Sequence, residues 1–183
     1  MRDDDFDFDS LPQEEKEVIL SQTKIVDAAF RFLREFYTNS DLEACWDLMD
    51  PTFKLCWAQW WIEANGRVLK IQGYDLPILA NALVEEGSNH EVWDDFQRVV
   101  LRDFRSAVPL DMEQAGIGSA PRVVAQDVQL LYVHETVPEK GAWQPGEASF
   151  AVPVVMRYID SDWKVLNFGY DQIPEPGWPP KFG

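Results

Sequence analysis

Two residues of one predicted strand, Tyr132 and His134, have the side chains in this sequence best suited to acid-base chemistry. Apolar and polar residues alternate from 123 to 135, which predicts a strand, and residues two apart in a strand point to the same face. An imidazole titrates near neutral pH and can accept or release a proton. We therefore take His134 as a candidate general acid or base, with Tyr132 as a hydrogen-bond donor beside it. The alternative is a packed histidine whose ring is satisfied by a carbonyl group or a water.

A second set of residues could hold a ligand without transforming it. Trp57 and Trp61 lie four residues apart and share one face of a predicted helix. Their indole rings could form a cage for a small apolar or aromatic ligand, or simply fill the core. In the last predicted strand, the amide of Asn167 could orient a ligand or bond to the backbone of a neighbouring strand. The candidate ligand-binding residues are therefore Trp57, Trp61, Tyr132, His134 and Asn167.

Other motifs point away from cofactors. Gly116-Ile117-Gly118 lacks the third glycine and the Lys-Ser/Thr pair with which a phosphate-binding loop surrounds phosphates. Cys45 and Cys56 occur in apolar stretches without the spacing of metal ligands or redox pairs, which predicts two buried, reduced thiols. We expect no cofactor, no metal site and no disulfide.

The composition indicates one globular domain with an acidic surface. The chain has 183 residues, of which 46% are hydrophobic, and its eight Trp and eleven Phe residues are sufficient for a sizeable core. Its 32 Asp and Glu residues outnumber its 16 Lys and Arg residues, and the formal net charge of -16 repels phosphate backbones and anionic lipids. We expect no binding to nucleic acid or to membranes, whereas a basic protein partner is compatible with this charge.

Neither a secretory signal nor a membrane span is expected. The N-terminus is acidic, which is the wrong charge for a signal, and no apolar run approaches the roughly 18 residues that a spanning helix needs. We therefore expect a cytoplasmic protein. Residues 1–11 form a predicted acidic flexible tail, residues 12–173 a single domain, and residues 174–183 a Pro-rich extended tail that Trp178 could anchor.

Five helices are predicted in the first half of the domain. Apolar residues that recur at spacings of three and four, among them Val18, predict a long helix over residues 12–38. Ser40 and Glu43 have the spacing of a capping box, in which a hydroxyl and a carboxylate satisfy free amides at a helix start. They predict a short second helix, and the same spacing from Ser88 to Glu91 predicts the start of the fifth.

The third helix should begin at Asp50-Pro51, because Asp is a good cap and Pro is well suited to the first turn. It should stop at Asn65-Gly66, since glycine commonly ends helices. A short strand is predicted over 67–71, and a fourth helix over 75–86 that ends at a glycine.

The residue pattern in the second half of the domain predicts an antiparallel sheet. After a loop over residues 110–120, strands are predicted over 123–135, 150–158 and 163–168. A bend at Asp160-Ser161-Asp162-Trp163 joins the last two strands. In the first strand, Tyr132 and His134 share a face with apolar residues, and we expect this face to meet the helices.

This order of elements resembles the nuclear transport factor 2-like superfamily. The resemblance covers about Ile19 to Asp171 and rests on Phe36-Tyr37-Thr38-Asn39-Ser40-Asp41-Leu42, on Asp50-Pro51-Thr52-Phe53 and on the hairpin around Trp163. It implies an α+β fold in which a curved antiparallel sheet wraps around a long N-terminal helix to form a cone. The cone either holds a small molecule or serves as an interaction surface, and the implied homodimer forms through the outer face of the sheet. The similarity is closest to uncharacterised bacterial members.

The enzyme patterns of the superfamily are incomplete in this chain. The resemblance implies that an isomerase would carry its general-base Asp just beyond Asp50-Pro51-Thr52-Phe53, where this chain has Leu55-Cys56-Trp57. The dehydratases use paired His residues on the sheet, and this chain offers only His134 there. The epoxide hydrolases use an Asp-Arg-Asp set, for which Arg157 and Asp127 lie on predicted strands.

We therefore expect a non-enzymatic module that binds a small ligand or a protein. The first alternative is a lyase, isomerase or hydrolase that uses His134 as acid-base and Tyr132 as donor inside the cone. This alternative fails if Phe53, Trp57 and Trp61 fill that space. The second alternative is an inhibitor or immunity-type protein whose acidic surface binds a basic partner.

Overall fold

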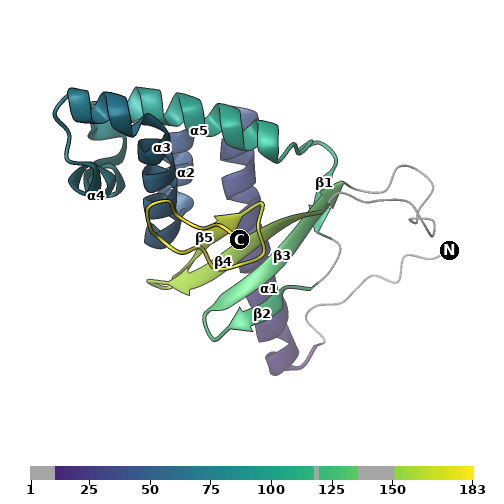
Figure 1. Cartoon of the computed structure of the whole chain (residues 1–183). Helices are drawn as coiled ribbons and strands as arrows, with labels where there is room; N and C mark the ends of the chain where they lie inside the picture. Colours follow the sequence, from purple (N-terminus) through teal and green to yellow (C-terminus); the bar gives the residue numbers. More distant parts are fainter. Residues whose placement is uncertain (1–10, 118–119, 136–150) are drawn as a thin grey trace.

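The computed structural model describes residues 11–117, 120–135 and 151–183 and has an α+β fold (Figure 1). In these ranges, five α-helices precede a five-stranded antiparallel sheet that does not close into a barrel. The predicted α+β class is thereby confirmed. The predicted acidic tail lies, except for Leu11, outside the described residues. Among the described residues, no helix combines the length and the apolar character needed to cross a bilayer.

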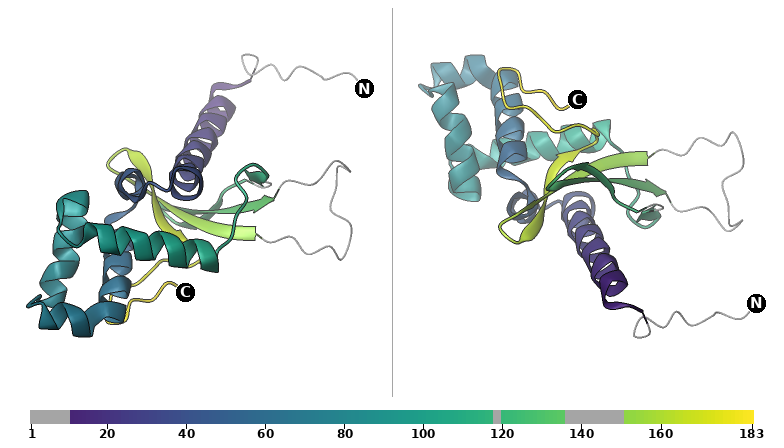
Figure 2. Two further views of the ribbon diagram at one scale, coloured as in Figure 1. Left: turned by 90° about the horizontal axis from the view of Figure 1, so that it is seen from above. Right: turned by 90° about the horizontal axis from the view of Figure 1, so that it is seen from below.

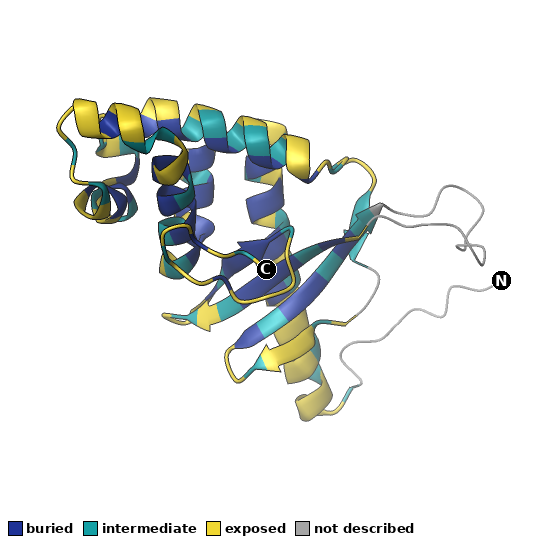
Figure 3. Ribbon diagram, in the orientation of Figure 1, coloured by how far each residue is buried: buried dark blue, intermediate teal, exposed yellow. Residues whose placement is uncertain are grey.

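The first helix, α1 (Gln13–Arg34), is buried only over its C-terminal half. The N-terminal half is exposed and projects past the sheet (Figures 2 and 3). Val18, which we expected on the buried face, is 55% exposed. A π-helical segment (Glu35–Asn39) continues the helix to the predicted end. The core receives side chains spaced three and four apart, namely Ile25, Ala28, Ala29, Phe32 and Leu33.

The short helix α2 (Leu42–Leu48) is capped by a different residue from the one expected. Asp41 accepts a hydrogen bond from the amide of Ala44 at 2.9 Å. Ser40 has a left-handed backbone, with φ of 60°, and ends the preceding segment. The predicted capping box at Ser40 is therefore wrong, because a carboxylate one residue later occupies the cap position.

The second predicted capping box is also wrong. The helix α5 (Trp93–Ala107) begins after Val92 without a side-chain cap. Ser88 lies in a short 3-10 turn, and its hydroxyl donates to the carboxylate of Glu43 at 2.6 Å. A contact between distant parts of the chain therefore uses the hydroxyl that local spacing assigned to a cap.

The helix α3 (Pro51–Ile71) begins where expected and ends later than expected. Asp50 caps it by accepting from the amide of Thr52 at 2.7 Å. The helix then runs through Asn65-Gly66, so the predicted stop and the predicted strand over 67–71 are wrong. A Cβ on Gly66 would lie 3.3 Å from the side chain of Leu76, the first residue of α4 (Leu76–Glu86). Close packing of α4 on α3 thus outweighs the tendency of this glycine to end a helix. α4 ends at the predicted residue and begins one residue later than predicted, with Asp75 as its cap.

The five strands of the sheet are β1 (Ala115–Ile117), β2 (Arg122–Ala125), β3 (Val128–Glu135), β4 (Ala151–Ile159) and β5 (Asp162–Phe168). β3, β4 and β5 are neighbours in that order, and β1 and β2 both pair with the other side of β3. The predicted strand over 123–135 is therefore two strands joined by a turn at Gln126-Asp127, and the predicted loop over 110–120 contains β1.

The two faces of β3 meet different surroundings. Leu131 and Val133 contact the main core, which the sheet forms with the helices. Val128 and Leu130 belong to a separate small cluster with residues of β4 and β5, and Tyr132 packs against that cluster. By strand alternation His134 shares the face of Tyr132, so the prediction that these two residues face the helices is wrong. Because apolar residues occupy both faces of β3, alternation alone cannot decide between them.

The C-terminal residues cross the sheet on the side opposite α1 (Figures 1 and 2). Phe182 packs against Phe53 and Phe104, with ring centroids 6.3 and 5.9 Å apart. Trp178, the expected anchor, is 41% exposed. Phe182 is thus the more deeply packed aromatic residue of this tail.

Candidate ligand-binding groove

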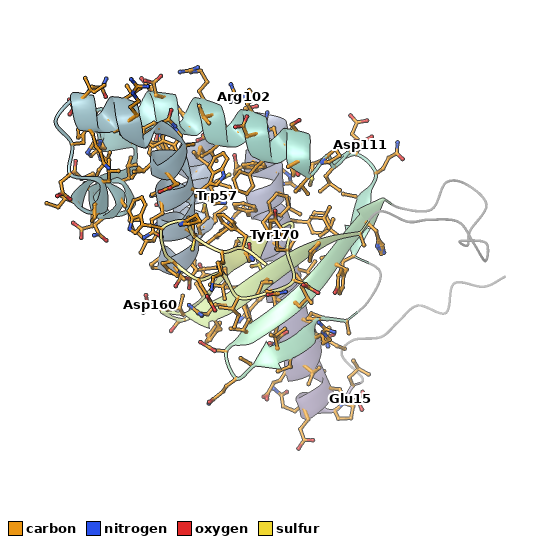
Figure 4. The ribbon with its side chains drawn as sticks, viewed as in Figure 1. Glu15, Trp57, Arg102, Asp111, Asp160 and Tyr170 are labelled. Carbon is orange, nitrogen blue, oxygen red and sulfur yellow. The ribbon has the colours of Figure 1, made fainter. Side chains whose placement is uncertain are left out.

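The two candidate tryptophans lie in the core. Trp57 is fully buried, and its ring centroid lies 4.6 Å from that of Phe104 and 4.8 Å from that of Phe53 (Figure 4). Trp61 is 4% exposed, and its ring packs against Phe96 at 5.7 Å. Trp61 also borders a cavity of about 330 Å³ beside α3 and α5. The aromatic side chains of α3 therefore fill much of the space in which a cage was expected.

The other three candidates do not lie at the α3 tryptophans. Tyr132 and His134 are partly exposed on the face of the sheet away from the main core. The amide group of Asn167 donates to the carbonyl oxygens of Gln172 and Phe182, both at 2.7 Å. Its side-chain oxygen accepts from the next backbone amide at 2.9 Å. The structure does not bring the five candidates together, and Asn167 holds the C-terminal tail.

Arg157 and Asp127 do converge, and Asp50 completes an Asp-Arg-Asp cluster. Arg157 Nη1 donates to Asp50 Oδ2 at 3.1 Å, and Arg157 Nε lies 3.6 Å from Asp127 Oδ2. Asp50 is 1% exposed, and its other oxygen accepts from the amide of Thr52 at the start of α3. Both oxygens of Asp50 are therefore engaged, one in capping α3 and the other in holding Arg157 of the sheet.

A cavity of about 810 Å³ lies between the exposed half of α1 and the sheet. A smaller cavity of about 230 Å³ follows it along α1, and the two share Lys24, Tyr158 and Trp163 as lining residues. We call the two cavities together the α1 groove. Its lining residues are Glu17, Leu20, Ser21, Lys24, Asp27, Ala28 and Arg31 of α1, Gln126, Asp127 and Gln129 of the β2–β3 hairpin, and Tyr158, Ser161, Asp162 and Trp163 of the β4–β5 hairpin.

The sequence builds the α1 groove by continuing two regular patterns beyond the core. On α1, the lining residues recur at spacings of three and four, as the buried residues further along the helix do. On the sheet, Gln129 and Tyr158 share strand faces with Leu131 and Met156, which contact the main core. Further along the chain, apolar side chains close the interface between α1 and the sheet. In the groove, polar and charged side chains replace them and the interface stays open.

An aromatic pair lies in the α1 groove. Tyr158 and Trp163 face each other across the β4–β5 hairpin, with ring centroids 5.3 Å apart. The turn residues Asp160 and Ser161 have φ of 52° and 65°, as a tight two-residue hairpin turn requires. Trp163 is 8% exposed, whereas Tyr158 is 49% exposed. A ligand in the groove would meet a rigid indole backed by the core and an accessible phenol ring.

The charge of the α1 groove changes along its length. Glu17 and Asp127 line the larger cavity from opposite walls, and Lys24 lies where the smaller cavity begins. Lys24 lies seven positions after Glu17, which is about 10 Å along the helix axis. In the part of the chain that the structure describes, neither Glu17 nor Lys24 forms a salt bridge. In the smaller cavity, Asp162 is paired with Lys164 at 3.3 Å and with Arg31 at 4.0 Å.

Among the described residues that line the groove, there is neither a cysteine nor a cluster suited to a metal ion. Within residues 11–117, 120–135 and 151–183, no group of three or more His, Cys, Asp or Glu residues could hold a metal. Cys45 and Cys56 are free and buried, as predicted. Burial raises the pKa of the Cys56 thiol to about 12, so this group stays protonated at neutral pH.

Sequence reasoning did not identify the α1 groove. The Tyr158–Trp163 pair could have been found, because residues placed symmetrically about a two-residue turn must face each other across the hairpin. The wall formed by α1 could not, since Glu17 and Lys24 at helical spacing have the pattern of an ordinary solvated face.

Comparison of the chain with protein-family models, with curated proteins and with solved structures gave no match in any of the three. The function must therefore be inferred from the geometry and chemistry of the site.

Proposed function

We propose that the protein is a non-enzymatic module of the nuclear transport factor 2-like superfamily that binds a small organic ligand in the α1 groove. In this proposal the sheet curves around α1 as a cone, and the groove is the open mouth of that cone. The observation that carries the proposal is the cavity of about 810 Å³ lined by the Tyr158–Trp163 pair. Its volume lies within the range of roughly 300–1,000 Å³ that is usual for small-molecule sites.

The lining of the groove supports binding more than catalysis. Leu20, Tyr158 and Trp163 provide apolar surface, and hydroxyl, amide and charged groups surround them. The candidates for proton transfer, Tyr132 and His134, lie on the other face of the sheet. No histidine is among the described residues that line either cavity. A ligand in the groove meets groups that recognise it, without a histidine beside it.

A homodimer and a cytoplasmic location are part of this proposal. The C-terminal tail lies over the sheet face opposite α1, where the resemblance places the dimer (Figure 2). A dimer of this kind would include the tail in its interface. Native mass spectrometry tests the oligomeric state: a dimer supports this part of the proposal, and a monomer at micromolar concentration removes it.

A fragment screen by ligand-observed NMR tests binding in the groove. Aromatic fragments should bind the wild-type protein. Ser21→Arg adds a long side chain to the groove wall and should lower the affinity for these fragments about tenfold or more. Gln22→Arg adds the same charge and bulk about 100° around the helix, and it should leave binding unchanged. Equal binding to both variants, or no binding fragment at all, would show that the groove is not the site.

A further inference from the structure

We infer that the α1 groove selects organic cations, which are ligands with one ammonium group on an aromatic or aliphatic body. This inference rests on the proposed function and adds to it the charge and the orientation of the ligand. The ammonium group lies between Glu17 and Asp127. The body of the ligand lies on Tyr158 and Trp163 and extends toward Lys24.

Two carboxylates make one end of the larger cavity negative. Glu17 belongs to α1 and Asp127 to the β2–β3 turn, so they approach the cavity from opposite walls. Glu17 accepts a hydrogen bond from the neutral side chain of Gln13 at 3.0 Å and, among the described residues, has no cationic partner. The side chain of Asp127 is 54% exposed and lies 3.6 Å from Arg157, so its charge is only partly compensated. Both carboxylates therefore line one cavity, and neither is fully neutralised by a cation among the described residues.

The aromatic pair suits the same ligand. An ammonium or methylated ammonium group is attracted to the electron-rich face of an aromatic ring, most strongly for Trp and Tyr. Tyr158 and Trp163 line the same cavity as the two carboxylates. A cationic ligand in this cavity is therefore favoured by the carboxylates and by the electron-rich rings, both of which disfavour an anion.

Lys24 sets the direction of the ligand. It borders both cavities, about two helical turns from Glu17. Its ammonium group repels a second positive charge at that end, so a ligand with a single cationic end fits better than a diamine. The net charge of -16 also raises the concentration of small cations near the whole surface.

Three probes of similar shape separate the outcomes: 2-phenylethylammonium, 2-phenylethanol and 3-phenylpropionate. In calorimetric titrations at low ionic strength, the cation should bind about fivefold more tightly than the alcohol, and the anion more weakly than either. Added salt should weaken binding of the cation and leave binding of the alcohol unchanged. This order tests the charge of the ligand independently of its shape.

Charge variants test the orientation. Glu17→Gln should lower the affinity for the cation about two- to fivefold, and Lys24→Gln should raise that affinity by a similar factor. Both changes should alter the affinity for the alcohol less than the affinity for the cation, because the alcohol carries no charge. Glu85→Gln, the matched control, removes the same charge from an exposed position of α4 and should leave all three affinities unchanged.

Failure of this inference is distinguishable from failure of the groove. If the protein prefers 3-phenylpropionate, or if Lys24→Gln abolishes binding of 3-phenylpropionate, the cation inference is overturned. The groove is then still a functional binding site. If all three probes bind equally and Ser21→Arg abolishes their binding, the cation inference is likewise overturned and the groove remains a binding site. If no probe binds and the fragment screen also gives no hit, the groove itself is not a binding site.

Discussion

Three buried polar side chains of the described residues, Asp50, Gln59 and Asn167, each form hydrogen bonds with backbone groups. Asp50 caps α3, while Gln59 accepts from the backbone amide of Gly177 at 2.8 Å. Asn167 donates to two carbonyl oxygens near the C-terminus. Two of the three therefore hold the C-terminal tail against the domain. A polar group left unsatisfied on burial costs about 1–3 kcal/mol, so these positions should be sensitive to substitution.

Asn167→Ala should destabilise the protein by about 2 kcal/mol, because three hydrogen bonds are lost and their partners stay in the folded structure. Urea unfolding measures the change. Asn81→Ala is the matched control, since it removes one exposed bond to the carbonyl of Pro77 and should cost less than about 0.5 kcal/mol. Equal effects of the two substitutions would mean that Asn167 does not hold the tail.

Asp50→Ala should cost more than Asp50→Asn. Alanine removes the cap of α3 and the partner of Arg157, whereas asparagine keeps an oxygen for the cap. We expect about 2–3 kcal/mol for alanine, below the usual cost of breaking a buried pair, because Arg157 is 22% exposed and retains Asp127. In a double-mutant cycle, Arg157→Met should cost less in the Asp50→Asn background than in the wild type. Additive effects of the two substitutions on stability would contradict an interaction between Asp50 and Arg157.

At the scale of residues, the direction of a side chain was more predictable than its role. Helical spacing correctly placed Trp57 and Trp61 on an inward face. Whether that face lines a cavity or fills a core depends on Phe96 and Phe104, which α5 contributes from far along the chain. For Asn167, backbone bonding is the observed role, although the partner is the C-terminal tail rather than a neighbouring strand.

At the scale of elements, two glycines should respond to alanine in opposite directions. Gly66→Ala should stabilise α3 by up to about 1 kcal/mol, because the new Cβ meets only the end of the Leu76 side chain. Gly87→Ala should destabilise by more than about 1 kcal/mol, since its φ of 54° suits glycine and Trp46 lies 3.3 Å from the new Cβ. Urea unfolding of both variants checks the order, and the reverse order would contradict it.

Two helix starts that depend on local chemistry were predicted correctly from the sequence, whereas the local capping box at Ser40 was not. The starts of α3 and α4 follow from an Asp cap and an early Pro, both of which act within one turn. Other predictions failed where packing between distant parts of the chain decided the outcome. Gly66 stays helical against α4, and the hydroxyl of Ser88 bonds to Glu43 instead of capping α5. The groove was missed for the same reason, since it exists only where α1 meets the sheet.

At the scale of the whole molecule, buried acids should make the fold sensitive to alkali. Burial raises the pKa values of Cys45, Cys56 and Tyr37. The stabilisation is complete below the unfolded pKa values, about 8.5 for a thiol and about 10 for a phenol, and it is lost as pH rises through the folded values. The lowered pKa of Lys54 acts in the opposite sense. The free energy of unfolding should therefore fall above about pH 9.

The double variant Cys45→Ala/Cys56→Ala isolates the thiols in this titration. Its free energy of unfolding should fall less steeply between pH 8.5 and pH 11 than that of the wild type, because the two groups with raised pKa are gone. Chemical unfolding at a series of pH values gives both curves. Parallel curves would mean that the thiols do not contribute.

The groove and the C-terminal tail lie on opposite sides of the sheet (Figures 1 and 2). Stability elements such as Asn167 are therefore separated from the proposed binding site. The helix-then-sheet order was predictable from the change in periodicity along the chain. The position of the tail was not, because a Pro-rich extended segment carries no pattern that states which surface it covers.

The central claim is that a small ligand binds in the α1 groove, and a ¹H–¹⁵N NMR titration tests it most directly. The titration uses 2-phenylethylammonium first and 3-phenylpropionate second. The signals that shift should belong to α1 from Glu17 to Arg31 and to Tyr158 and the indole of Trp163, while those of His134 stay in place. Shifts confined to the face of His134 or to the cavity beside Trp61, or no shift with either probe at millimolar concentration, would contradict the account.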